Sequence, residues 1–73
     1  MAKNSTHQVV VGNIGIVCDT SDENEAASVF DEYVRLSKAK YGRVANEPVI
    51  LMEVFEGGTV HIVNEYTPQK ENE

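Results

Sequence analysis

Cysteine is almost absent from this sequence, since Cys18 is the only one among 73 residues. A disulfide within the chain needs two cysteines and a cysteine-rich zinc site needs several, so neither of these cross-links can stabilise the domain. A chain of this length holds one domain at most and buries only about 60% of the surface that its unfolded state exposes. Because small domains usually need a staple or a partner, we expect a homodimer.

Basic residues are also scarce, with 6 Lys and Arg against 12 Asp and Glu and a formal net charge of −6. Duplex binding relies on Lys and Arg that displace counterions, so general nucleic-acid binding is not expected. Long apolar runs are missing as well. The longest is far shorter than the roughly 20 residues of a membrane span, and the polar start does not resemble a signal peptide. We therefore expect a soluble protein of the cytoplasm with no membrane partner.

What is present is a patterned segment between two polar ends. Met1–Gln8 and Thr67–Glu73 contain almost no apolar residues, and we predict that both are disordered tails around a single domain at 9–66. The first part of that domain, Val9–Cys18, is rich in Val and Ile on both of its faces. This composition is typical of a buried strand.

Two glycines, Gly12 and Gly15, interrupt this first strand. Glycine inside a strand indicates a bulge or a close approach of another backbone. A phosphate-binding loop is the alternative interpretation. However, the segment Gly-Asn-Ile-Gly lacks the third glycine of a nucleotide-binding fingerprint.

A helix is predicted at about Asp22–Tyr41. Thr20 and Glu23 have the spacing of a capping box, and Asp22 is an alternative cap. Gly42 is expected to follow the helix in the left-handed conformation. Apolar residues recur at helical spacing and form one face: Ala26, Val29, Phe30, Tyr33, Leu36 and Ala39.

The last part of the domain predicts a hairpin, with strands at Val49–Phe55 and Val60–Tyr66 joined by a turn at Gly57 and Gly58. This turn would place Phe55 opposite Val60 and would fix which side chains share a face. One face would then pack on the helix. The other face would carry Ile50, Met52, Val54, His61 and Val63.

These elements predict an α+β fold of the order β-α-β-β, a three-stranded, mainly antiparallel sheet with one helix packed on one face. We favour the last strand in the middle, antiparallel to both neighbours. The alternative places Val49–Phe55 in the middle and makes one pair parallel. A lone helix covers one face only, so the apolar second face is expected to bind a second copy or another protein.

Four basic residues gather near the predicted end of the helix: Arg35, Lys38, Lys40 and Arg43. They complement the helix dipole, and they could also bind an anion such as a phosphate. Arg43 could contact a carboxylate or phosphate, and its simplest partner is Glu47, four residues further on. The candidate ligand- or partner-binding residues are Lys38, Lys40, Tyr41, Arg43 and Glu47.

Catalytic and metal-binding patterns are not recognised. His61 could be joined as a metal ligand only by His7, so no metal site is expected. Cys18 has no neighbouring base in the sequence, and a thiol without a base or a lowered pKa is a poor nucleophile. Paired carboxylates, a Ser-His-Asp arrangement and a P-loop do not appear. We expect neither an enzyme nor a cofactor.

Several short stretches of this chain match a known pattern: 10–15, 30–34, Ser37, 41–49 and 64–66. In these stretches the chain resembles a group of small accessory proteins of tailed bacteriophages. The resemblance implies a protein made in the infected cell, where small acidic proteins often bind and block host machinery. It brings no catalytic residues.

The leading hypothesis is therefore a non-enzymatic homodimer that binds and modulates or inhibits a host protein. One rival is a protein that binds or sequesters a nucleotide-like anion at Tyr41, Arg43 and the basic residues. A second rival is an acidic mimic of DNA. The sequence weighs against mimicry, because its acidic residues are spread over both ends and several elements.

Overall fold

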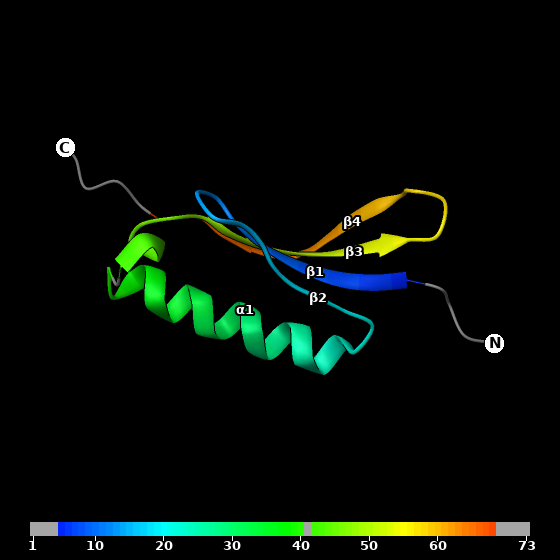
Figure 1. Cartoon of the computed structure of the whole chain (residues 1–73), viewed down its shortest axis with the longest axis horizontal. Coiled ribbons are helices and arrows are strands. Elements are labelled where there is room, and N and C mark those ends of the chain that lie inside the picture. Colours follow the sequence, from blue (N-terminus) through cyan, green and yellow to red (C-terminus); the bar gives the residue numbers. More distant parts are fainter. Residues whose placement is uncertain (1–4, 41, 69–73) are drawn as a thin grey trace.

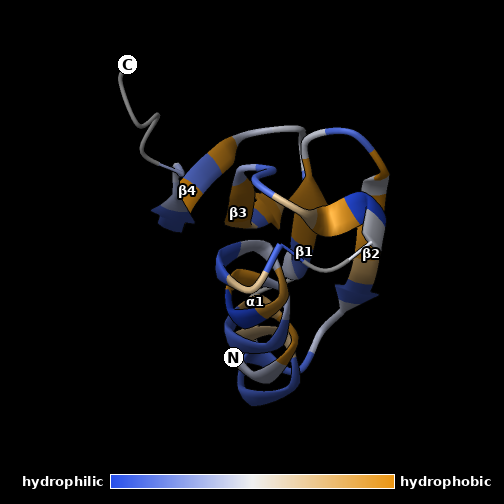
Figure 2. Ribbon diagram, turned by 90° about the vertical axis from the view of Figure 1, so that its left-hand side faces the viewer, coloured by the Kyte–Doolittle hydropathy of each residue, from blue (hydrophilic) through white to orange (hydrophobic). Residues whose placement is uncertain are grey.

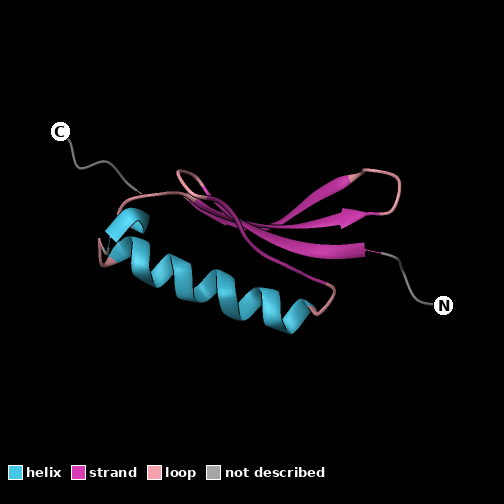
Figure 3. Cartoon of the chain, viewed as in Figure 1, coloured by secondary structure: helices cyan, strands magenta, loops and turns pink. Residues whose placement is uncertain are grey.

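A four-stranded sheet with one helix on one face forms the protein in the computed structural model, which describes residues 5–40 and 42–68 (Figure 1). The predicted α+β class and the single helix on one face are confirmed. Tyr41 and residues 1–4 and 69–73 of the predicted tails lie outside the described residues. The elements are β1 (Ser5–Val11), β2 (Gly15–Thr20), α1 (Glu23–Lys38), the short 3-10 helix η1 (Gly42–Val44), β3 (Val49–Phe55) and β4 (Val60–Tyr66) (Figure 3).

The predicted strand Val9–Cys18 is two strands, so the prediction of a three-stranded sheet was wrong. The chain turns back between β1 and β2, where the Ile14 N–H donates to the Val11 carbonyl at 3.0 Å and Gly15 has a φ of +105°. A hairpin therefore replaces the expected bulge in a continuous strand. In addition, β1 begins at Ser5, so residues 5–8 belong to the sheet and not to a tail.

The strand order is β2-β1-β3-β4, and every neighbouring pair is antiparallel. The order that we favoured, with the last strand in the middle, is wrong, because β3 lies between β1 and β4. The alternative is right that Val49–Phe55 lies between the first and the last strand, but the parallel pair that it required does not form. The reason is the early hairpin, which reverses the chain before the helix and so makes β1 antiparallel to β3.

The β3–β4 pairing follows the predicted register at one end only. Val49 lies opposite Tyr66 and Leu51 opposite Asn64, as predicted. Nearer the turn the register shifts by one residue, so Met52 faces Ile62. Val63 is the extra residue of this bulge. Its insertion moves the side chains of residues 60–62 to the opposite face from the predicted one. The prediction that Phe55 lies opposite Val60 was wrong, because Val60 pairs with Val54. The Phe55 N–H instead donates to the Thr59 carbonyl at 2.8 Å.

The core lies between the sheet and α1. Alternate residues of β1 and β3 point toward the helix, as the strand period requires. The buried apolar side chains are Val9, Val11, Ala26, Phe30, Val44, Val49 and Leu51. The strand β4 takes little part in this core, since six of its seven residues are exposed.

The helix begins as the sequence predicts and ends earlier. Asp22, the alternative cap, accepts from the Asn24 N–H at 2.9 Å. The helix ends at Lys38, and Lys40 takes the left-handed conformation expected of Gly42, with a φ of +57°. Gly42 is left-handed too, with a φ of +58°, but it begins η1.

Ser37 explains the early end of α1, because its groups hold the segment that leads to β3. Its side chain is fully buried, and its hydroxyl donates to the Glu47 carbonyl at 2.9 Å. Its own carbonyl accepts from the N–H groups of Lys40 and Asn46, at 3.1 and 3.2 Å. These bonds fold the chain back against the last turn of the helix.

We expect Ser37→Ala to lower the free energy of unfolding by about 1–2 kcal/mol, because it removes one hydrogen bond and leaves the Glu47 carbonyl without its partner. Urea titration followed by circular dichroism measures this loss. Ser28→Ala, at an exposed position of the same helix, is the matched control. Equal stability of the Ser37 variant and the wild type would contradict the assigned role.

Candidate functional site

The face of the sheet opposite the helix is the main candidate site, and we call it the outer face. Cross-strand pairing arranges its side chains in rows. One row runs Ile16–Val10–Ile50–Glu65, the next Asp19–Gln8–Met52–Ile62, and the third Thr6–Val54–Val60. Seven of these eleven side chains are apolar, and they form a continuous patch across all four strands.

The helix leaves this patch open (Figure 2). Ile16 is 59% exposed, Val60 51% and Ile62 47%. Large apolar side chains that stay exposed singly are ordinary, but a contiguous set on one face marks an interaction surface. The outer face therefore has the character of an interface and not of a solvated sheet face.

The prediction for this face is right for some residues and wrong for others. Ile50, Met52 and Val54 lie on the outer face, as expected. His61 does not, because the bulge places it opposite Glu53 on the helix side. Val63 is the bulged residue itself and is 44% exposed.

The sequence did not predict that Val60 and Ile62 lie on the outer face, because no local signal indicates a bulge at Val63. It also missed the contribution of Val10 and Ile16, which face each other across the unexpected hairpin. Because side chains alternate along a strand, Val10 and Ile16 already share one face of the segment when it is read as a single strand. The hairpin places β2 beside β1, so that Ile16 and Val10 form one surface with the outer residues of β3.

A polar row crosses the helix side of the sheet, where His7, Glu53 and His61 lie on neighbouring strands. The Ser5 hydroxyl donates to the Glu53 carboxylate at 2.9 Å. This hydroxyl is bonded to a carboxylate and not to an imidazole, so the row lacks the pair of nucleophile and base that a serine hydrolase uses. Within residues 5–40 and 42–68, no group of three or more ligating side chains is arranged to hold a metal ion.

His7, which we predicted to lie in a tail, is buried in β1 at 7% exposure. Its Nδ1 atom has no hydrogen-bond partner among the described residues. Its neighbours across the ladders are Thr20 and Glu53. A buried histidine in the central part of a sheet was not expected from the polar sequence around it.

The basic residues at the end of α1 do not gather into one site. Arg35 pairs with Glu32 at 3.8 Å. The Lys38 ammonium lies 5.5 Å from the centre of the Tyr66 ring, where the face of the ring attracts a cation. Two of the four basic residues are thus engaged within the chain.

The other candidates near the end of the helix are less defined. Lys40 and Arg43 are exposed, and Tyr41 lies outside the described residues. Glu47 interacts through its main-chain carbonyl, which accepts from Ser37. Among residues 5–40 and 42–68, the predicted Arg43–Glu47 ion pair does not form, whereas Arg35 pairs with Glu32.

Cys18 is partly buried in β2 and packs against the core. Burial raises the pKa of its thiol, and the nearby carboxylates of Glu25 and Asp19 raise it further. A raised pKa lowers the fraction of reactive thiolate at neutral pH. The environment of Cys18 therefore suits packing and not nucleophilic chemistry.

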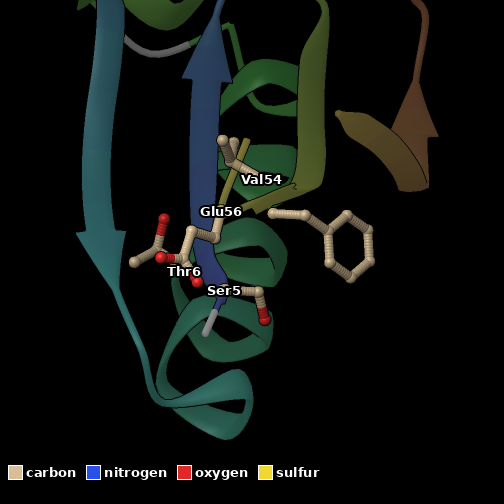
Figure 4. Close-up of a pocket in the computed structure, with 5 residues that line it drawn as sticks. Ser5, Thr6, Val54 and Glu56 are labelled. Carbon is tan, nitrogen blue, oxygen red and sulfur yellow. The ribbon is translucent and has the colours of Figure 1, made fainter. Parts of the chain in front are cut away.

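Two hollows lie at the margins of the sheet. One, of about 420 Å³, opens where β1 begins and β3 ends and is lined by Ser5, Thr6, Val54, Phe55 and Glu56 (Figure 4). The other, of about 360 Å³, lies between β2 and α1, and we call it the β2–α1 groove. Its lining consists of Val17, Ser28, Val29, Glu32, Tyr33 and Leu36.

Comparison with family models, with curated protein sequences and with solved structures finds no match to this chain. The resemblance to bacteriophage accessory proteins therefore stays a prediction. Among the described residues, no helix combines the length and the apolar character needed to cross a membrane.

Proposed function

We propose that the chain is a non-enzymatic interaction protein that forms a homodimer through the outer face and, in this form, binds and modulates a protein of the host cell. The observation that carries the proposal is the apolar patch that spans four strands and that the helix leaves open. The host and its cytoplasm as the site of action follow from the resemblance to phage accessory proteins. No family, relative or structural neighbour adds to that part.

The size of the outer face can be compared with that of specific interfaces. Four strands of about seven residues, spaced roughly 4.8 Å apart with a rise of about 3.3 Å per residue, give a flat footprint of roughly 440 Å². A specific interface uses roughly 600–1,000 Å² of accessible surface on each partner, so the flat footprint alone is somewhat smaller than a dimer interface needs. A dimer that stacks two outer faces must therefore also bury the surface of the side chains that stand on them.

The distribution of polar residues favours stacking of two sheets. On β4, apolar Val60 and Ile62 point to the outer face, whereas His61 and Asn64 lie on the helix side. A second copy on the outer face therefore covers Val60 and Ile62 and leaves His61 and Asn64 in water. Glu65, which is also on the outer face, lies on the edge strand β4 at the margin of the patch. A two-fold axis makes such a surface self-complementary.

We expect Met52→Glu to convert a dimer into a monomer, because two-fold symmetry would bury two unpaired carboxylates in the apolar interface. Sedimentation at tens of micromolar measures the mass against the 8.1 kDa of one chain. Ala27→Glu, which adds the same charge at an exposed position of α1, is the matched control and should stay dimeric. A wild-type protein that sediments as a monomer would contradict the proposed dimer.

A further inference from the structure

The edge of β2 beside α1 forms a second surface that the proposed dimer leaves open. In the sheet order, β2 is an edge strand, so one side of its backbone has no neighbouring strand in the described chain. The β2–α1 groove is lined by residues of β2 and α1 and therefore lies on the helix side of this edge. The helix packs on one side of the sheet (Figure 2), and the outer face lies on the other side. Exposed edges beside a helix are the places where extended peptides add to a sheet.

The β2 wall of the groove is apolar because of a bulge in β2. Val9 pairs with Cys18 and Val10 with Ile16, so Val17 is the extra residue. Bulges redirect side chains, and here Val17 packs toward the core beside Cys18 instead of facing the outer side. Val17 thus gives the groove its β2 wall.

The helix supplies the other wall at regular spacing. Val29, Tyr33 and Leu36 follow one another at intervals of four and three residues, so they line one side of α1. All three are partly buried and leave part of each side chain accessible. An extended segment added to β2 would direct every second side chain into this apolar channel.

Charge indicates the kind of segment that fits. Glu32 lines the groove, and Glu25 is exposed near the start of the helix. Arg35 offsets Glu32 only in part, because their contact is 3.8 Å long and their side chains are 71% and 61% exposed. A second copy would bring the same acidic residues against each other, whereas a basic segment would be attracted.

We infer that the β2–α1 groove binds an extended segment of a partner protein, in which apolar side chains alternate with Lys or Arg and whose backbone pairs with β2 as an added strand. The inference rests on the proposed interaction function and names the chemistry of the partner. It does not require the dimer, since the two surfaces lie on opposite sides of the sheet.

The test uses a capped seven-residue peptide of alternating Val and Lys, added to the ¹⁵N-labelled full chain. We expect amide shifts in Gly15–Thr20 and along the groove side of α1. Methylation of the peptide nitrogens on one edge should weaken binding at least about tenfold, and methylation on the other edge should not, because only one edge pairs with β2. Equal binding of both methylated peptides, shifts on β4 or the outer face, or no shifts at millimolar peptide would overturn the inference.

A charge reversal tests the acidic rim without disturbing the core. Glu32→Lys, at an exposed position, should weaken the Val/Lys peptide roughly fivefold and strengthen a Val/Glu peptide. Asp31→Lys makes the same change at an exposed residue that does not line the groove, and should bind like the wild type. Sedimentation of the same samples reports the dimer separately. Failure of the wild-type dimer to bind the Val/Lys peptide would overturn the groove and leave the proposed function standing.

Discussion

Phe30→Ala should lower the free energy of unfolding by about 3–5 kcal/mol, the largest loss that we expect from one substitution. Phe30 is 6% exposed and belongs to the core between α1 and the sheet. Its truncation loses the burial of an aromatic ring and leaves a cavity that close-packed neighbours fill only in part. A chain of 73 residues has a total stability of roughly 4–11 kcal/mol, so the variant should lose between about a quarter and all of its stability.

Urea titration and thermal melts at one fixed protein concentration measure this effect, since a dimer makes stability depend on concentration. Ile14→Ala is the control, because Ile14 is 41% exposed in the turn between β1 and β2. Its effect should stay within about 0.5 kcal/mol. If Phe30→Ala melts within a degree or two of the wild type, the helix is not anchored through Phe30.

Gly12→Val should destabilise the protein by about 1–3 kcal/mol, because Pro48 occupies the space that a side chain would need. A Cβ atom on Gly12 would lie 2.8 Å from Pro48 Cγ and 2.9 Å from Pro48 Cδ. The proline ring is stiff, so the backbone must move. That movement would strain the bond from the Gly12 N–H to the Pro48 carbonyl, which is 2.9 Å long.

A double-mutant cycle separates this steric effect from a general preference for glycine. Gly12→Ala alone should destabilise, and the same change combined with Pro48→Ala should cost clearly less than the sum of the two single changes. Denaturant titration of the four proteins gives the coupling. Additive losses would show that Gly12 is not held by its contact with Pro48.

Much of the fold can be read from local patterns. The apolar spacing and Asp22 place the start of α1, and the two glycines at Gly57 and Gly58 place the β3–β4 turn. The close approach indicated by Gly12 is present, as its contact with Pro48 shows. These signals succeed because they depend on a few neighbouring residues, whose conformational preferences the sequence displays directly.

The candidate site was predicted less completely, because its residues depend on register. The sequence indicated an apolar second face and identified Ile50, Met52 and Val54 as members of it. A bulge of one residue at Val63 then exchanged His61 for Ile62. Strand periodicity assigns faces correctly only until the first bulge, and the energy that favours a bulge comes from packing across strands.

The sequence by itself determined three properties of this protein. The chain is acidic, its helix has one apolar face, and its strands carry more apolar residues than that helix can cover. Only the tertiary structure decided that residues 9–18 turn back into a hairpin, that β3 lies between β1 and β4, and that Ser37 ends the helix by bonding the chain beyond it. The physical reason is that these choices depend on hydrogen bonds and contacts between segments far apart in the chain. Local propensity does not encode such pairings, and the burial of one shared core selects among them.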